Sequence, residues 1–275
     1  MSNLLEFGYL TNSLLAAIFA AISCGLIGTY IVSRRIVFVS GGLTHASFGG
    51  IGIGHFIGIN PIIGAAVFSV LAALGIEIFS NRRLVRQDSV IAMLWSLGMA
   101  LGIIFIFITP GYAPNLMSYL FGSILTVSSL DILFLGGLSL VSIIVFSVMY
   151  KVILYVSFDE DFARTRNLPV QTVKYLMISL VALAIVFNIR VVGIILVLSL
   201  LTVPQSIVSL FTNKYHKIMI FSVLTGLVGT LTGLAAAWYL NIPSGATIVF
   251  VLVIMFALAS GAKYMRSHAT RQIKF

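Results

Sequence analysis

The chain has 275 residues, of which 60% are hydrophobic and only 8% are charged. A soluble domain carries about 25% charged residues, so this composition excludes a water-soluble fold and predicts a protein that the lipid bilayer surrounds. The net charge of +9 does not indicate nucleic acid binding, because the basic residues occur in small groups between apolar segments.

Nine apolar segments follow one another, each near the ~20 residues that a helix needs to cross a membrane. We therefore expect an all-α polytopic membrane protein, a single transmembrane domain over residues 1–275 with about nine transmembrane helices. Because only Ile189–Val191 separates the sixth segment from the seventh, eight to ten helices are compatible with the pattern. The segments cover residues 7–32, 43–59, 62–80, 89–109, 130–150, 174–189, 192–212, 217–240 and 246–263.

The basic residues are distributed asymmetrically about these segments. Fifteen of the sixteen Lys and Arg residues fall on one side, and only Arg190 falls on the other. Short loops rich in Lys and Arg remain cytoplasmic. The pattern therefore predicts a multi-pass protein of the cytoplasmic (inner) membrane, with its N-terminus outside and its C-terminus in the cytoplasm.

The second segment contains the first candidate site. Ser40–His55 includes six glycines, which let membrane helices approach closely. A histidine in such a segment is costly unless it faces a cavity or a partner, so His45 is a candidate metal ligand. The alternative is a hydrogen bond from His45 to a backbone carbonyl in a tightly packed bundle. Thr44, Ser47 and His55 are weaker candidate ligands.

Residues 110–129 do not form a simple span. Pro110, Gly111 and Pro114 end the fourth segment, and the apolar stretch Leu116–Leu125 is too short to cross the membrane. We expect a broken or half-inserted helix here, because irregular backbone at membrane depth must be covered by protein or line a cavity.

The longest polar stretch, residues 157–169, predicts a short helix on the cytoplasmic side. Ser157 is expected to cap its N-terminus, the acidic residues 159–161 suit its first turn, and Pro169 is expected to stop it. Phe158 and Phe162 are four residues apart and are expected to project together. Such a helix can anchor to lipid or dock a soluble partner; its acidic start argues against anionic lipid.

Three more residues and several absences complete the pattern. Pro204 predicts a kink in the seventh segment, Glu77 is expected to pair with Arg82 or Arg83, and Asp88 to begin the fourth helix. The sequence contains no G-x-x-x-x-G-K-[ST] loop for ATP and no H-E-x-x-H zinc motif. Its single cysteine, Cys24, excludes an intrachain disulfide.

In this order and spacing the motifs are specific, and the chain resembles the membrane permeases of ABC transporters that import zinc, manganese or iron (the ABC-3 type). The resemblance covers nearly the full length. It rests on Ser40–Gly54 with Thr44-His45-Ala46, Arg86–Ile91, Leu120–Leu125 before Asp131, Phe158–Arg164, Leu168–Val170, Gly193–Pro204 and Pro243–Ala246.

The resemblance implies a homodimeric permease that is not itself an enzyme and binds no cofactor. Two cytoplasmic ATPase subunits would hydrolyse ATP, and an extracytoplasmic metal-binding protein would deliver the cargo. His45 would match the family's metal-contacting histidine, and Gly193 and Pro204 would lie at the kink that gates the path. The residues coupled to the ATPase would be Ser157, Phe158, Asp159, Glu160, Asp161, Phe162, Ala163 and Arg164.

Two positions depart from the family's pattern. The family usually has an aspartate four residues before the histidine, where this chain has Gly41, and small residues after the proline, where it has Gln205 and Ser206. The missing carboxylate keeps open a permease of the same architecture that carries a metal chelate or other small cargo. A further alternative, of a different class, is a secondary transporter or membrane enzyme that works without ATP.

Overall fold

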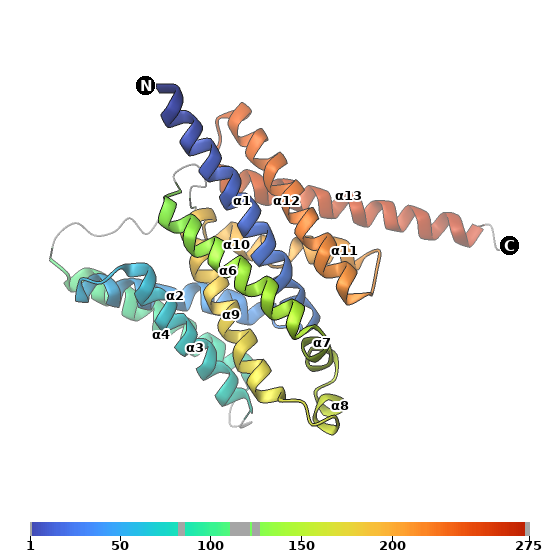
Figure 1. The fold of residues 1–275 in the computed structure, drawn as a ribbon, viewed down its shortest axis with the longest axis horizontal. Helices are drawn as coiled ribbons and strands as arrows, with labels where there is room; N and C mark the ends of the chain where they lie inside the picture. Colours follow the sequence, from blue (N-terminus) through green and yellow to red (C-terminus); the bar gives the residue numbers. More distant parts are fainter. Residues whose placement is uncertain (1, 82–85, 111–121, 123–126, 273–275) are drawn as a thin grey trace.

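A computed structural model describes residues 2–81, 86–110, 122 and 127–272 of the chain (Figure 1). Every regular element in these ranges is an α-helix, as the sequence predicts. In chain order the helices are α1 (Ser2–Ser33), α2 (Val37–Ile57), α3 (Pro61–Asn81), α4 (Gln87–Ile108), α6 (Ser129–Val148), α7 (Tyr150–Phe158), α8 (Glu160–Thr165), α9 (Val170–Val192), α10 (Ile194–Leu200), α11 (Val203–Ser209), α12 (Tyr215–Leu240) and α13 (Ser244–Gln272).

Seven stretches in the described residues are long and apolar enough to cross a membrane. Helix α2 is not among them, and residues 170–209 form one apolar stretch of 40 residues that includes α9, α10 and α11. The expected count of nine spans and the expected orientation of the termini therefore stay predictions. The broken helix expected at 110–129 lies almost wholly outside the described residues.

Helices α2, α3 and α4 lie together and form one lobe of the molecule (Figure 1). Helix α3 also packs against α9, which joins this lobe to the rest of the bundle. The stretch from α9 to α11 is the most deeply buried candidate span, because 78% of its most apolar 18-residue segment lies inside the protein. The core therefore centres on α9, and the lobe that contains His45 is held to it through α3.

Helices α7 and α8 form a corner at the end of the molecule where α1 ends and α9 begins (Figure 1). Helix α7 contacts α1, α6 and α9, and α8 contacts α7 and α9. Asn167, with φ 53°, turns the chain out of α8, and Pro169 caps the start of α9. The polar stretch is thus held against the bundle instead of extending freely from it.

Candidate metal pathway and coupling site

Close packing of α2 against α4 sets the surroundings of His45. A Cβ atom added at Gly98 of α4 would lie 2.6 Å from Ala46 Cα, and one added at Gly52 of α2 would lie 2.5 Å from Gly102 O. Such distances leave no room for a side chain, so the two backbones touch, as small residues permit in membrane helices. The expectation of a tightly packed glycine-rich helix is confirmed.

His45 stacks on an aromatic side chain of the neighbouring helix. Its imidazole and the indole of Trp95 have centroids 4.3 Å apart and planes inclined by 5°. His45 is half-buried, whereas the residues on either side of it, Thr44 and Ala46, are buried. Within the described residues, no group of three or more His, Cys, Asp or Glu side chains could hold a metal ion. A metal at His45 would therefore need further ligands from water, a second chain or the cargo itself.

The weaker candidate ligands are not gathered around His45. The Thr44 hydroxyl donates to Ser40 O at 2.7 Å and the Ser47 hydroxyl donates to Thr44 O at 2.6 Å, and both side chains are buried. His55 lies in the last turn of α2, ten residues or ~15 Å along the helix from His45. The hydroxyls of Thr44 and Ser47 thus serve the backbone of their own helix.

Open space lies one turn before His45. A Cβ atom added at Gly41 would meet no atom within 4 Å, whereas one at the adjacent Gly42 would strike the side chain of Ile91. Gly41 and His45 are four residues apart and share one face of α2. This face therefore has room for a side chain, a water molecule or a cargo beside the imidazole.

The polar stretch is helical, but its cap differs from the prediction. Ser157 is buried in the last turn of α7, where its hydroxyl donates to Ile153 O at 2.6 Å. Asp159 is the cap instead: its carboxylate accepts the backbone N–H of Phe162 at 2.9 Å. Asp159 takes this role because its extended backbone, with φ −149°, separates α7 from α8. Glu160 and Asp161 occupy the first turn, as predicted.

Phe158 and Phe162 do not project together. Because the chain breaks at Asp159, the two residues belong to different helices and their helical spacing does not apply. The ring of Phe158 lies edge-on to Tyr215 at 6.0 Å, and that of Phe162 lies edge-on to Tyr155 at 5.4 Å. Both phenylalanines remain exposed and are available to a partner.

A network of four charged side chains links α8 to three other helices. Glu160 of α8 pairs with Arg34, just after α1, at 2.5 Å and with Lys174 of α9 at 3.4 Å. Lys174 also pairs with Glu77 of α3 at 2.6 Å. Arg82 and Arg83, the partners expected for Glu77, lie outside the described residues. Only 8% of the Lys174 side chain and 12% of the Glu77 side chain are exposed. These ion pairs therefore tie α8 to α9, to the end of α1 and, through Lys174, to α3.

The Glu160 carboxyl is charged at neutral pH. Partial burial raises its pKa, but the hydrogen bond from Arg34 and the positive charges of Arg34 and Lys174 outweigh this and hold the pKa below its ordinary value. A carboxyl whose pKa falls on folding stabilises the folded state above its ordinary pKa, and this contribution disappears as the pH falls through the lowered pKa. The link between α8 and the bundle is therefore strongest at neutral pH and weakens in acid.

The buried stretch after α9 is broken twice. Gly193, with φ 79° and ψ 162°, ends α9 at a conformation that only glycine adopts easily. A second break at Leu201 and Thr202 separates α10 from α11, and Pro204 lies in the first turn of α11. The boundary expected at Ile189–Val191 is thus wrong, and Pro204 lies in the first turn of a new helix rather than bending a continuous one.

Gln205 bridges the second break to α1. Its amide nitrogen donates to Cys24 O at 2.9 Å and to Leu200 O at 3.2 Å, and the side chain is fully buried. The backbone of α1 permits this because Gly28 leaves the space that the Gln205 side chain fills. The departure from small residues at this position therefore has a structural reason: the amide satisfies the Leu200 carbonyl that the broken helix leaves free and ties it to α1.

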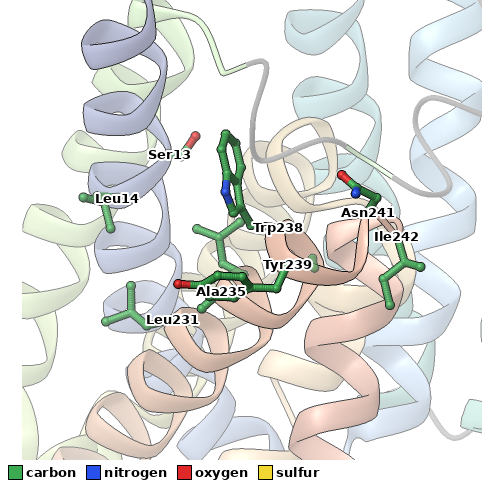
Figure 2. A pocket seen from close by; sticks show the side chains of 10 residues that line it. Ser13, Leu14, Leu231, Ala235, Trp238, Tyr239, Asn241 and Ile242 are labelled. Atoms are coloured by element: carbon green, nitrogen blue, oxygen red, sulfur yellow. The ribbon is translucent and has the colours of Figure 1, made fainter.

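A groove of about 580 Å³ lies between α1 and α12. Figure 2 shows Trp238 of α12 opposite Ser13 of α1, with Asn241 and Ile242 at the end of the groove. Its lining is mainly apolar and includes no His, Cys, Asp or Glu, so it offers no ligand set for a metal. Contact with lipid suits this lining better than contact with an ion.

Sequence reasoning missed Trp95, Lys174 and Arg34 as members of these sites. Trp95 carries no local signal, because its meeting with His45 depends on the register of two helices. Lys174 had one indirect signal: Glu77 is an acid in an apolar segment, and such a residue must find a cationic partner. Arg34 had another: it is a basic residue directly after an apolar segment.

The chain matches the model of the ABC 3 transport family over residues 6–263. It is 38% identical to an uncharacterized membrane protein of Synechocystis sp., over 94% of this chain and 92% of that protein. It is 33% identical to the manganese transport system membrane protein MntC of Halalkalibacterium halodurans, over 93% of this chain and 88% of that protein. Its fold resembles a chain in the structure of PsaBC from Streptococcus pneumoniae in complex with Fab, with TM-score 0.83, 29% identity, and coverage of 94% and 93%.

These similarities extend over almost the whole chain and agree with its apolar helices. The protein is a membrane permease, a multi-pass protein of the cytoplasmic membrane. It belongs to the ABC 3 transport family.

Proposed function

We propose that this chain is the permease subunit of an ATP-driven importer of divalent transition metals: zinc, manganese or iron. The observation that carries the proposal is the half-buried imidazole of His45, which stands beside open space at Gly41 in a part of α2 whose other residues are mostly buried. Imidazole is a common ligand of these metals. Relatives named for manganese transport support the cargo class.

The proposed topology has nine transmembrane helices, with the N-terminus outside. Adding α2 and dividing the 40-residue stretch into two spans raises the seven candidate spans to nine. In that arrangement α8 lies in the cytoplasm, together with the ends of α1 and α3. The excess of basic residues on that side supports the orientation.

Helix α8 is the proposed contact with a separate cytoplasmic ATPase. The exposed side chains of α8, which include Phe162, would contact the partner together with the exposed Phe158 at the end of α7. When ATP binding closes the partner subunits, a push on α8 would reach α3 through Glu160, Lys174 and Glu77. Because α3 packs against α2, the push would tilt the helix that carries His45.

The transporter would contain two copies of this chain, two ATPase subunits and an extracytoplasmic metal-binding protein. One imidazole from each copy gives a weak, open site, unlike the closed four-ligand sites that retain structural zinc. A weak site suits a carrier that must release its cargo.

A chelated metal is the second candidate cargo. It is favoured by the missing carboxylate at Gly41 and by the lack of a ligand cluster among the described side chains. A chelate supplies its own ligands, so the open space beside His45 would then receive an organic group.

The test is the ATPase activity of the reconstituted complex, stimulated by Zn²⁺, Mn²⁺ or Fe²⁺, for the wild type and His45→Ala. His216→Ala, an exposed histidine at the start of α12, is the matched control. Stimulation by one metal that is lost only in His45→Ala supports the proposal. If no free metal stimulates an active complex, the chelate becomes the better candidate, and uptake that persists with an inactive ATPase would support a secondary transporter.

A further inference from the structure

We infer that Trp95 is a positioning residue for metal transfer: its indole holds the His45 imidazole in the orientation that receives the metal. The inference rests on the proposed function, in which His45 contacts the cargo. It starts from the stack of the two rings, 4.3 Å between centroids and 5° between planes.

The stack leaves both imidazole nitrogens usable. A metal binds an imidazole in the plane of its ring, through the lone pair of the unprotonated nitrogen. An indole parallel to that plane covers one face of the imidazole and neither nitrogen. Trp95 therefore restricts rotation of the His45 ring without competing for the metal.

The ring has no polar support in the described part of the chain. A metal-binding histidine usually donates its second N–H to a carboxylate or a carbonyl, which sets the orientation of the ring. No hydrogen bond or ion pair among the described residues reaches the His45 imidazole. The specific contact that the imidazole makes is the ring stack on Trp95. The indole thus takes the place of the usual polar support.

The backbone holds Trp95 at this position. On one side of it Ile91 fills the space that Gly42 leaves, and on the other Gly98 touches Ala46. Trp95 lies between these two contacts on α4, as His45 lies between Gly42 and Ala46 on α2. Because the two helices approach this closely on both sides of the rings, their packing sets the register that brings the indole onto the imidazole.

The test is the concentration dependence of Mn²⁺ uptake by cells that express the complete transporter with Trp95→Leu or Trp95→Phe. Loss of the flat ring in Trp95→Leu is expected to raise KM about tenfold, in the range of an aromatic pair, with a smaller effect on maximal uptake. Trp95→Phe retains a flat ring and is expected to restore most of the wild-type KM. Met93→Leu, at an exposed position of the same helix, is the control.

A role for Trp95 in packing alone predicts a different result. Trp95→Leu would then lower the amount of assembled transporter and the maximal uptake but leave KM unchanged, and this outcome would overturn the inference. His45→Ala separates this failure from failure of the proposed function. If His45→Ala transports like the wild type, the proposed function is wrong; if it abolishes uptake while Trp95→Leu keeps the wild-type KM, only the role of Trp95 is wrong.

Discussion

Gly41 is the residue at which this chain lacks a carboxylate that its family usually supplies, and the structure has room for one. A Cβ atom at Gly41 meets no neighbour within 4 Å, so Gly41→Asp fits without moving the backbone. The new carboxylate would share a face of α2 with His45 and add a hard ligand for the metal. We expect half-maximal Mn²⁺ uptake at about tenfold lower concentration, the effect of one charge-assisted contact, and slower maximal uptake because release becomes harder.

Gly41→Asn is the control for that substitution, because it adds nearly the same volume without the charge. Uptake measured over a range of Mn²⁺ concentrations separates the two variants. Identical curves for Gly41→Asp and Gly41→Asn would mean that the cargo does not pass close to this face of α2.

At the residue scale, the sequence predicts that a polar group needs a partner or that a helix needs a cap, but not which residue fills that role. His45 is predictable as a candidate site residue, because an imidazole in an apolar, glycine-rich segment is costly unless it faces a cavity or a partner. Trp95 and Lys174 are not, since each meets its partner across helices far apart in the sequence. Ser157 and Asp159 are both good caps, and only the break of the chain at Asp159 decides between them.

Among the elements, the charged network between α8 and α3 offers a direct test of coupling. Lys174→Met leaves Glu77 and Glu160 without the cation that lies between them. Removing one partner of a buried pair costs about 3–5 kcal/mol, so we expect a clear loss of thermal stability and of Mn²⁺ uptake. Thermal unfolding of the purified protein and uptake in cells are the measurements.

The matched control is Lys151→Met, an exposed lysine on α7. Glu77→Gln combined with Lys174→Met should cost less than the sum of the single changes, because the pair is lost only once. If the two substitutions add, Lys174 and Glu77 act independently and α8 is not linked to α3 in this way.

The contact of α2 with α4 is the second element to test. Gly98→Ala would place a Cβ atom 2.6 Å from Ala46 Cα, a backbone atom that cannot move aside. Overpacking of this kind costs about 1–3 kcal/mol and would displace His45 from its place in the lobe. We expect a lower unfolding temperature and a higher KM for Mn²⁺.

Gly137→Ala on α6 is the comparison, because a Cβ atom there meets nothing within 4 Å. It should leave both values unchanged or raise stability slightly, since alanine favours a helix over glycine. Equal effects of Gly98→Ala and Gly137→Ala would show that the approach of α2 to α4 is less close than the glycines indicate.

Helix boundaries follow the apolar runs where the runs have clear ends. Helices α3, α4 and α6 begin and end within a few residues of the predicted limits. Helix α2 starts at Val37 rather than 43, because the small residues of Ser40–Gly42 lower its hydropathy without interrupting it. Arg190 does not end α9, because its long side chain reaches Asp131 at 3.3 Å and the helix continues to Val192.

For the whole molecule, the decisive prediction concerns orientation, and the chain provides a convenient background for it. Its single cysteine, Cys24, is buried, so maleimides should not label the wild type. A cysteine in place of the exposed Ile59, between α2 and α3, would lie outside. A cysteine in place of the exposed Thr165, at the end of α8, would lie in the cytoplasm.

We expect a membrane-impermeant maleimide to label Ile59→Cys in intact cells and Thr165→Cys only after the cells are permeabilised. Asn213→Cys, exposed before α12, serves as a second cytoplasmic position. Mn²⁺ uptake by each variant shows that it remains assembled. Labelling of Thr165→Cys in intact cells would reverse the topology, and it would place α8 where no cytoplasmic ATPase can reach it, so coupling through Glu160 and Lys174 would fail together with the orientation.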